Sequence, residues 1–113
     1  MSPGEIYLAS FPFGGTVGAK IRSVLLLTGP VGPVPEVLVG YITSVVPATL
    51  LPTDVVLDPT QPECQAANLK TVSTLRLHKL ATIHQTDLVR SLGVLSSAVW
   101  QEVEIKLRLL LQL

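Results

Sequence analysis

Short apolar segments, separated by glycine- and proline-containing turns, occupy most of the chain before its last seventh. In these segments, residues at alternate positions fall on opposite faces of an extended chain, or valine and leucine form short runs. Both patterns predict β-strands. The predicted strands are Gly4–Phe11, Arg22–Thr28, Glu36–Ser44, Asp54–Asp58, Lys70–Leu77 and Val89–Leu95. The apolar run Val24–Leu27 indicates a strand that is buried on both faces. Gly40, inside the third strand, indicates a bulge or a tight bend.

The C-terminal segment has the spacing of an amphipathic helix instead. One apolar stripe is formed by Val99, Val103, Leu107 and Leu110. Ser96 or Ser97 is expected to cap the first turn, since a serine oxygen can accept from a free backbone N–H there. Two opposite-charge pairs are spaced four residues apart, Glu102 with Lys106 and Glu104 with Arg108. The tail Leu109–Leu113 is apolar around most of the helix, so we expect it to cover a partner subunit as well.

These elements predict a mainly β fold with a C-terminal helix, in which a small barrel or curled sheet carries the helix at one end. Pro59–Leu69 is predicted to be a polar loop, and His84–Asp87 a helical turn. The 113 residues are enough for a single domain, residues 1–113. A chain of this size buries only about two-thirds of its unfolded surface. We therefore expect a closed sheet, an oligomer, or both.

Composition excludes several classes of protein. Hydrophobic residues make up 48% of the chain, charged residues 14%, and the formal net charge is 0. The chain is too apolar to be disordered and too balanced in charge to bind nucleic acid by net charge alone, so such a role needs a local basic patch. Its charge-free stretches are broken by glycine and proline and are too short for a spanning helix. With no secretory signal and one cysteine, Cys64, the expected location is the cytoplasm.

The common catalytic templates are missing from the sequence. It contains no phosphate-binding loop motif and no Gly-x-Ser-x-Gly elbow. His78, His84 and Cys64 lack the spacing of a metal site, so we expect no metal and no cofactor. Two histidines could in principle serve as the acid and the base of an RNA cleavage reaction. These two lie around a predicted turn, however, and are expected at the surface or the barrel rim.

A basic residue at the start of the second strand is the strongest remaining candidate. Lys20 and Arg22 are the only charges between Glu5 and Glu36, and they follow a glycine-rich loop. The planar guanidinium of Arg22 suits a phosphate and keeps its charge. If the third strand lies beside the second, the hydroxyls of Thr43 and Ser44 lie near Arg22 at the same rim. Taken alone, an arginine at the start of a strand is usually a solvated rim charge, Thr43 is ordinary in a strand, and the glycine-rich loop fits a flexible hairpin connection equally well.

Several segments, taken in order, resemble the MazF/PemK family of toxin endoribonucleases of type II toxin–antitoxin systems, and most of all its PemK-like branch. The resemblance rests on Gly4–Leu8, Phe11–Phe13 with the glycine-rich loop, Lys20–Leu27, Ile42–Ser44, Leu51–Val55, Leu77–Ile83 and Leu92–Ser96. Each motif is weak alone, but together they span nearly the whole chain. The family usually has proline after the arginine, where this chain has Ser23. Proline holds the preceding residue extended, so serine favours a looser arginine and puts full activity in question.

The resemblance implies an SH3-like barrel of five to seven strands that works as a homodimer and cuts single-stranded RNA without a metal. The catalytic arginine of the family falls on Arg22 and its catalytic threonine on Thr43. The ribose 2′-hydroxyl would attack the phosphorus, leaving a 2′,3′-cyclic phosphate and a 5′-hydroxyl. Phe13, at the start of the loop over the RNA, is the candidate for base stacking, and Lys20 and Ser44 are candidates for RNA contact.

Further cations are candidates for the phosphate path. Arg76 and Lys79, together with Lys70, would extend it, although a solvated face is an equal interpretation. The expected partner is a cognate antitoxin whose flexible acidic segment covers the Arg22 rim. Two alternatives stay open: a catalytically decayed barrel that binds RNA or antitoxin as a homodimer, and a structural dimerisation domain.

Overall fold

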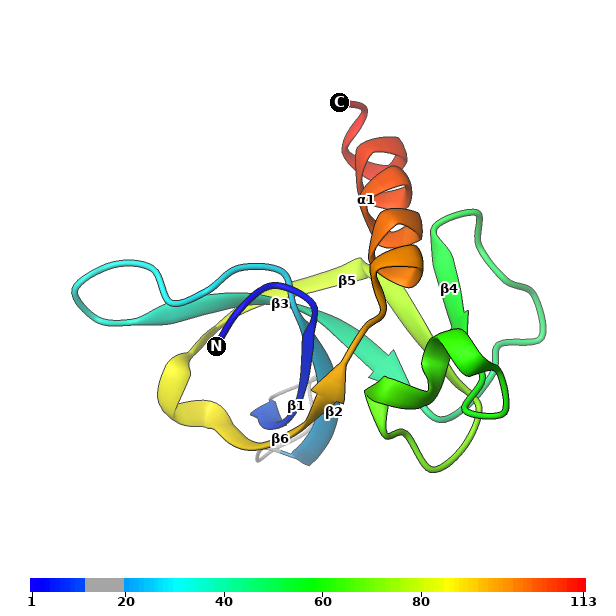
Figure 1. Cartoon of the computed structure of the whole chain (residues 1–113). Coiled ribbons are helices and arrows are strands. Elements are labelled where there is room, and N and C mark those ends of the chain that lie inside the picture. Colours follow the sequence, from blue (N-terminus) through cyan, green and yellow to red (C-terminus); the bar gives the residue numbers. More distant parts are fainter. Residues whose placement is uncertain (12–19) are drawn as a thin grey trace.

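The computed structural model describes residues 1–11 and 20–113, which form six strands, two short 3-10 helices and one α-helix (Figure 1). The strands are β1 (Glu5–Phe11), β2 (Lys20–Leu26), β3 (Glu36–Thr43), β4 (Asp54–Leu57), β5 (Ser73–His84) and β6 (Leu88–Val94). The helices are η1 (Pro62–Ala67), η2 (Gln85–Asp87) and α1 (Ser97–Leu111).

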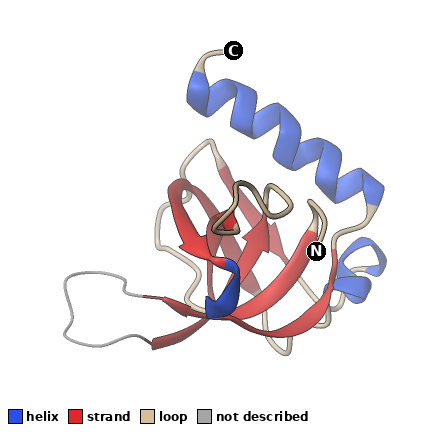
Figure 2. Cartoon of the chain, turned by 90° about the vertical axis from the view of Figure 1, so that its left-hand side faces the viewer, coloured by secondary structure: helices blue, strands red, loops and turns tan. Residues whose placement is uncertain are grey.

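All six strands belong to one antiparallel sheet with the order β4-β5-β3-β2-β1-β6. The sheet curls strongly, and α1 lies across one side of it (Figure 2). The predicted mainly β class with a C-terminal helix is therefore confirmed, as is the number of strands. The curled sheet is open, because β4 and β6 are its two edges and pair only with β5 and β1.

The two faces of the curled sheet pack two separate cores. Val24, Leu25 and Leu26 of β2 are completely buried, which confirms that this strand is covered on both sides. Leu25 joins the larger core, which includes the inner face of α1, and Val24 and Leu26 join the smaller core. The buried apolar side chains of β2 and β3 fit this arrangement because a central strand presents alternate residues to opposite faces.

Helix α1 is attached to the larger core by the predicted stripe. Val99 and Val103 are buried, and Leu107 and Leu110 pack against the same core. The Ser96 hydroxyl oxygen accepts a hydrogen bond from the Val99 N–H at 3.3 Å, so Ser96 is the N-cap. Among the described residues, none forms a helix with the length and hydrophobicity needed to cross a bilayer.

Two features differ from the sequence-based expectations. The strand predicted at Lys70–Leu77 begins at Ser73 and continues to His84. It stays paired with β3 beyond Leu77 because a bulge opposite Gly40 and Tyr41 accommodates three extra residues of β5. That bulge confirms the expectation for Gly40. The segment Pro59–Leu69, predicted as a polar loop, contains the 3-10 helix η1. This helix places the side chains of Cys64 and Ala67 in the larger core.

Candidate functional site

A cavity of about 560 Å³ opens where the beginning of β2 and the end of β3 meet the segment that follows η1. Its volume lies in the range of ligand-binding pockets. Its walls come from β1, β2, β3 and the two residues after it, β6, the connection between η1 and β5, and the first residue of β5. The lining residues are Leu8, Ile21, Arg22, Ser23, Tyr41, Ile42, Thr43, Ser44, Val45, Asn68, Leu69, Lys70, Thr71, Ser73, Arg90 and Leu92.

Arg22 reaches the cavity from an interior strand. Its backbone pairs with Ala9 of β1, and the following residue, Ser23, pairs with both Leu8 and Ile42. The side chain is half-buried, and its Nη1 donates to the carbonyl oxygen of Ile21 at 3.1 Å. Within residues 1–11 and 20–113 the guanidinium forms no ion pair, so most of its N–H donors remain available to a ligand.

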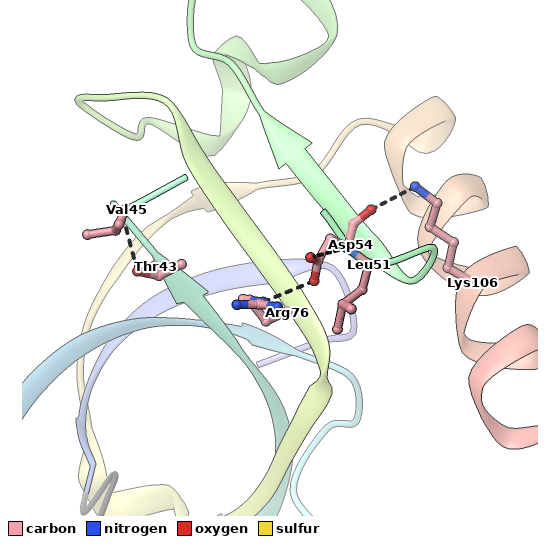
Figure 3. A network of polar contacts seen from close by, with 6 residues as sticks. All are labelled: Thr43, Val45, Leu51, Asp54, Arg76 and Lys106. Carbon is pink, nitrogen blue, oxygen red and sulfur yellow. Dashed lines mark hydrogen bonds and ion pairs between the residues drawn. The ribbon is translucent and has the colours of Figure 1, made fainter. Parts of the chain in front are cut away.

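Thr43 is the last residue of β3 and lies at the same rim. Its Oγ1 accepts a hydrogen bond from the backbone N–H of Val45 at 3.1 Å, as Figure 3 shows. A hydroxyl oxygen that is engaged as an acceptor keeps its own proton free to donate. Because β2 and β3 are neighbours in register, Arg22 and Thr43 line one cavity, and the expected closeness of the two residues at one rim is confirmed. Ser44 is exposed beside them and also lines the cavity.

The cavity is basic although the chain is neutral. Its charged lining residues are Arg22, Lys70 and Arg90, and none of the lining residues is an aspartate or a glutamate. Three of the eight lysines and arginines therefore face one opening without a local carboxylate. Such a wall attracts an anion, and the hydroxyls of Ser23, Thr43 and Ser44 add hydrogen-bonding groups suited to phosphate oxygens.

Arg76 is placed elsewhere, and its guanidinium has a different partner. Its Nε donates to Oδ1 of Asp54 at 3.1 Å, across the β4–β5 pair (Figure 3). The Asp54 side chain is 0% exposed and also accepts from the Leu51 backbone N–H through Oδ2 at 2.8 Å. Lys106 of α1 donates to the Asp54 carbonyl oxygen at 2.8 Å and so joins the helix to the same network. Arg76 does not line the cavity.

The remaining predicted RNA contacts have three different positions. Lys20 is exposed at the beginning of β2, just outside the lining residues. The Lys79 ammonium lies over the ring of Tyr41, 5.5 Å from its centroid, and Tyr41 lines the cavity. Phe13, the residue predicted to stack on a base, lies outside the described residues.

The titratable groups that remain do not build a second reactive site around the cavity. His78 and His84 are exposed on β5 as expected, and neither lines the cavity. Burial raises the pKa of the Cys64 thiol above its ordinary value, so this cysteine is a poor nucleophile at neutral pH. In the described part of the chain, His, Cys, Asp and Glu side chains form no cluster of three that is able to hold a metal ion.

Comparison with known families now adds to this geometry. Residues 2–111 match the family model of the PemK-like, MazF-like toxins of type II toxin–antitoxin systems. The chain belongs to this family. The resemblance carried by the motifs from Gly4 to Ser96 is therefore confirmed. Sequence comparison finds no curated relative.

Solved structures of one MazF toxin and two endoribonucleases share the fold. The chain is similar to the Mycobacterium tuberculosis toxin MazF-mt6, with a TM-score of 0.74, 25% identity, and coverage of 96% of this chain and 97% of that one. A mycobacterial endoribonuclease in complex with its cognate antitoxin gives a TM-score of 0.70 at 17% identity, with 100% and 96% coverage. A further mycobacterial endoribonuclease gives 0.67 at 16%, with 100% and 92% coverage.

Two residues that line the cavity, Arg90 and Asn68, were not among the candidates predicted from the sequence. Arg90 is a single cation in a predicted strand, and Asn68 is a polar residue in a predicted loop. Nothing near them in the sequence indicates that β6 and the end of η1 come together. Asn68 adopts a left-handed backbone with φ of 56°, and its Nδ2 donates to the Leu92 carbonyl oxygen at 2.8 Å. Asparagine tolerates this left-handed backbone better than most residues, which is the one feature of its residue type that fits the position.

Proposed function

We propose that the protein is the toxin of a type II toxin–antitoxin system and acts as a metal-independent endoribonuclease on single-stranded RNA in the cytoplasm. The observation that carries the proposal is the placement of Arg22 and Thr43 in one open cavity whose lining has cations and hydroxyls but no carboxylate. Family membership and the likeness to MazF-mt6 agree with this activity.

The chemistry follows from the groups in the cavity. The ribose 2′-oxygen forms a bond to the adjacent phosphorus while the bond from phosphorus to the 5′-oxygen breaks. Negative charge develops on the non-bridging oxygens, where the Arg22 guanidinium stabilises it and the Thr43 hydroxyl donates a hydrogen bond. The 2′-hydroxyl proton leaves to water, and the 5′-oxygen takes a proton from water, while the Arg22 guanidinium keeps its charge. The products are a 2′,3′-cyclic phosphate and a 5′-hydroxyl.

The hydrogen bond from Val45 to Thr43 supports the assigned role of the threonine. Because the oxygen of Thr43 accepts the Val45 N–H, the hydroxyl proton is not used in that contact and stays available to a ligand. The free guanidinium donors of Arg22 support its role in the same way, since no described carboxylate competes for them. Donors that are fixed before the substrate arrives need not reorganise when charge develops.

The test is cleavage of a mixed-sequence RNA transcript in EDTA by the purified protein. Cleavage is expected to leave 5′-hydroxyl ends, and a 2′-deoxy residue at a mapped site is expected to abolish it there. Arg22→Ala and Thr43→Val should each lower kcat, for Arg22 by roughly 10²–10³-fold. Arg108→Ala, an exposed arginine on α1, is the matched control for charge. Unchanged cleavage by Arg22→Ala would refute the site, and RNA binding without any cleavage would favour the decayed barrel.

A cognate antitoxin is the proposed protein partner. An acidic, flexible segment that lies over the Arg22 rim would occupy the same cations as RNA and so exclude it. Co-expression with any small protein that is encoded beside the gene tests this. The complex should lose RNA cleavage, and Arg22→Ala should weaken its formation. An inhibitor that binds the variant and the wild type equally well would show that it binds elsewhere.

A homodimer is proposed from the outer face of α1. Ile105 and Leu109 are 68% and 58% exposed, an unusual degree for large apolar side chains one turn apart. Leu110 is unsuitable as a probe, because it packs against the core of its own chain. Sedimentation of Ile105→Glu and Leu109→Glu is expected to shift the protein to monomer, whereas Glu104→Gln on the polar side should not. A dimer that survives both apolar changes refutes this surface.

A further inference from the structure

The cavity has a second group of cations that the proposed reaction does not use. Lys70 and Arg90 line it together with Arg22, but they come from other elements. Lys70 lies in the connection between η1 and β5, and Arg90 lies in β6, where it pairs with Leu8 of β1. Arg22 and Thr43, in contrast, belong to β2 and β3. The cavity therefore has one wall with Arg22 and Thr43, assigned to the reacting phosphate, and a second positively charged wall with Lys70 and Arg90.

The wall with Lys70 and Arg90 is held as one unit by close packing between η1 and β6. Asn68, two residues before Lys70, donates through Nδ2 to the carbonyl oxygen of Leu92, two residues after Arg90, at 2.8 Å. Gly93 lies against the backbone of η1, so that a Cβ at this position would overlap the Ala66 carbonyl oxygen. These contacts join the segment just before Lys70 to the segment just after Arg90.

Both cations are available to a ligand. Among the described residues, the side chains of Lys70 and Arg90 form neither a hydrogen bond nor an ion pair, and both residues are exposed. Arg76 and Lys106 differ, because carboxylates and a carbonyl oxygen engage them. Two uncommitted cations on the wall of a cavity without carboxylates are suited to a second anionic group of the same ligand. In a polynucleotide, that group is a neighbouring phosphodiester.

We propose that Lys70 and Arg90 bind a phosphate next to the scissile one and so position the RNA strand in the cavity. The inference rests on the proposed function, since it assumes that Arg22 and Thr43 hold the scissile phosphate. The two residues act on binding and not on the chemical step. Their loss should therefore raise KM and leave kcat at saturation nearly unchanged.

The experiment uses an octamer that contains a mapped cleavage site, with a 2′-deoxy residue at the scissile position for binding measurements. Lys70→Met and Arg90→Met should each weaken binding by roughly three- to tenfold at low salt, and the double variant should lower the slope of log affinity against log salt by about 0.7. Arg108→Met removes one charge from a surface away from the cavity and should change neither quantity. Circular dichroism establishes that the variants fold.

A methylphosphonate scan identifies the phosphate. Replacing one flanking phosphate at a time with an uncharged methylphosphonate should weaken wild-type binding strongly at one position. At that position, the double variant should lose no further affinity, because the partner charge is already gone. If wild-type protein cleaves the octamer but the scan gives additive losses at every position, the inference is wrong and the proposed function stands. If wild-type protein neither binds nor cleaves RNA, both fall together.

Discussion

Replacing Asp54 by alanine tests the buried ion pair between Asp54 of β4 and Arg76 of β5. The carboxylate is fully buried, the Arg76 side chain is 19% exposed, and the Leu51 N–H uses the second carboxylate oxygen. The alanine leaves a mostly buried guanidinium and a backbone donor without an acceptor. Removing one partner of a buried pair costs about 3–5 kcal/mol, because the other charge remains desolvated.

For a chain of this length, about 1 kcal/mol shifts Tm by roughly 4 °C, so Asp54→Ala should lower Tm by about 12–20 °C. Arg76→Met should also destabilise, and the double variant should be less unstable than the sum of the two singles, with a coupling energy of about 2 kcal/mol. Thermal and urea unfolding followed by circular dichroism measure these values. All variants are compared at one protein concentration, because association adds to stability.

The same variants decide what Arg76 does. If its main role is the contact with Asp54, Arg76→Met lowers stability while the salt dependence of RNA binding stays as in the wild type. A fall of about 0.7 in the salt slope would instead keep Arg76 among the RNA-binding residues. A Tm for Asp54→Ala within about 3 °C of the wild type, or additive single changes, would refute the reasoning about the buried pair.

Three further predictions concern local packing and capping. Gly93→Ala forces a methyl group against the Ala66 carbonyl oxygen and should destabilise by about 2–3 kcal/mol in urea unfolding, whereas an unchanged midpoint would show that η1 moves freely. Ser96→Ala removes the cap on the Val99 N–H and should cost about 1 kcal/mol, with no loss if water replaces the serine. The raised pKa and burial of Cys64 should make its reaction with a thiol reagent at pH 8 slow in folded protein and fast in urea, and equal rates would contradict its burial.

Much of the fold was predictable because its signals are local. The apolar run in β2 has to be covered on both faces wherever it lies, and Ser96 caps whichever helix follows it. Gly40 indicated the β5 bulge for a similar reason, since its lack of a side chain admits Leu75, whose Cδ1 would lie 3.2 Å from a Cβ there. In each case the residue type restricts the backbone or the burial by itself.

The charged residues were harder to place, because a charge does not say which partner it has. Arg76 and Arg90 look alike in sequence, each a cation in a strand. Register places Arg76 opposite Asp54, whereas Arg90 pairs with Leu8 beside the cavity. Only the long-range pairing of β4 with β5 and of β1 with β6 separates a structural arginine from a candidate ligand-binding one. The adjacency of Arg22 and Thr43 was accessible, because it required only that β2 and β3 be neighbours.

The pairing of β2 with its neighbours bears on the effect of having Ser23, and not proline, after Arg22. A proline after the arginine restricts it to extended backbone, and its absence predicted a looser side chain. Here β2 is an interior strand, and the pairing of Ala9 with Arg22 and of Ser23 with both Leu8 and Ile42 restricts the same backbone by hydrogen bonding. Ser23→Pro removes one backbone N–H from this strand, so circular dichroism must first show that the variant folds. If the sheet alone positions Arg22, the folded variant changes the kcat of RNA cleavage by less than about threefold. A rise in kcat of tenfold or more on this change would show that the pairing leaves the arginine loose, as the sequence alone suggested.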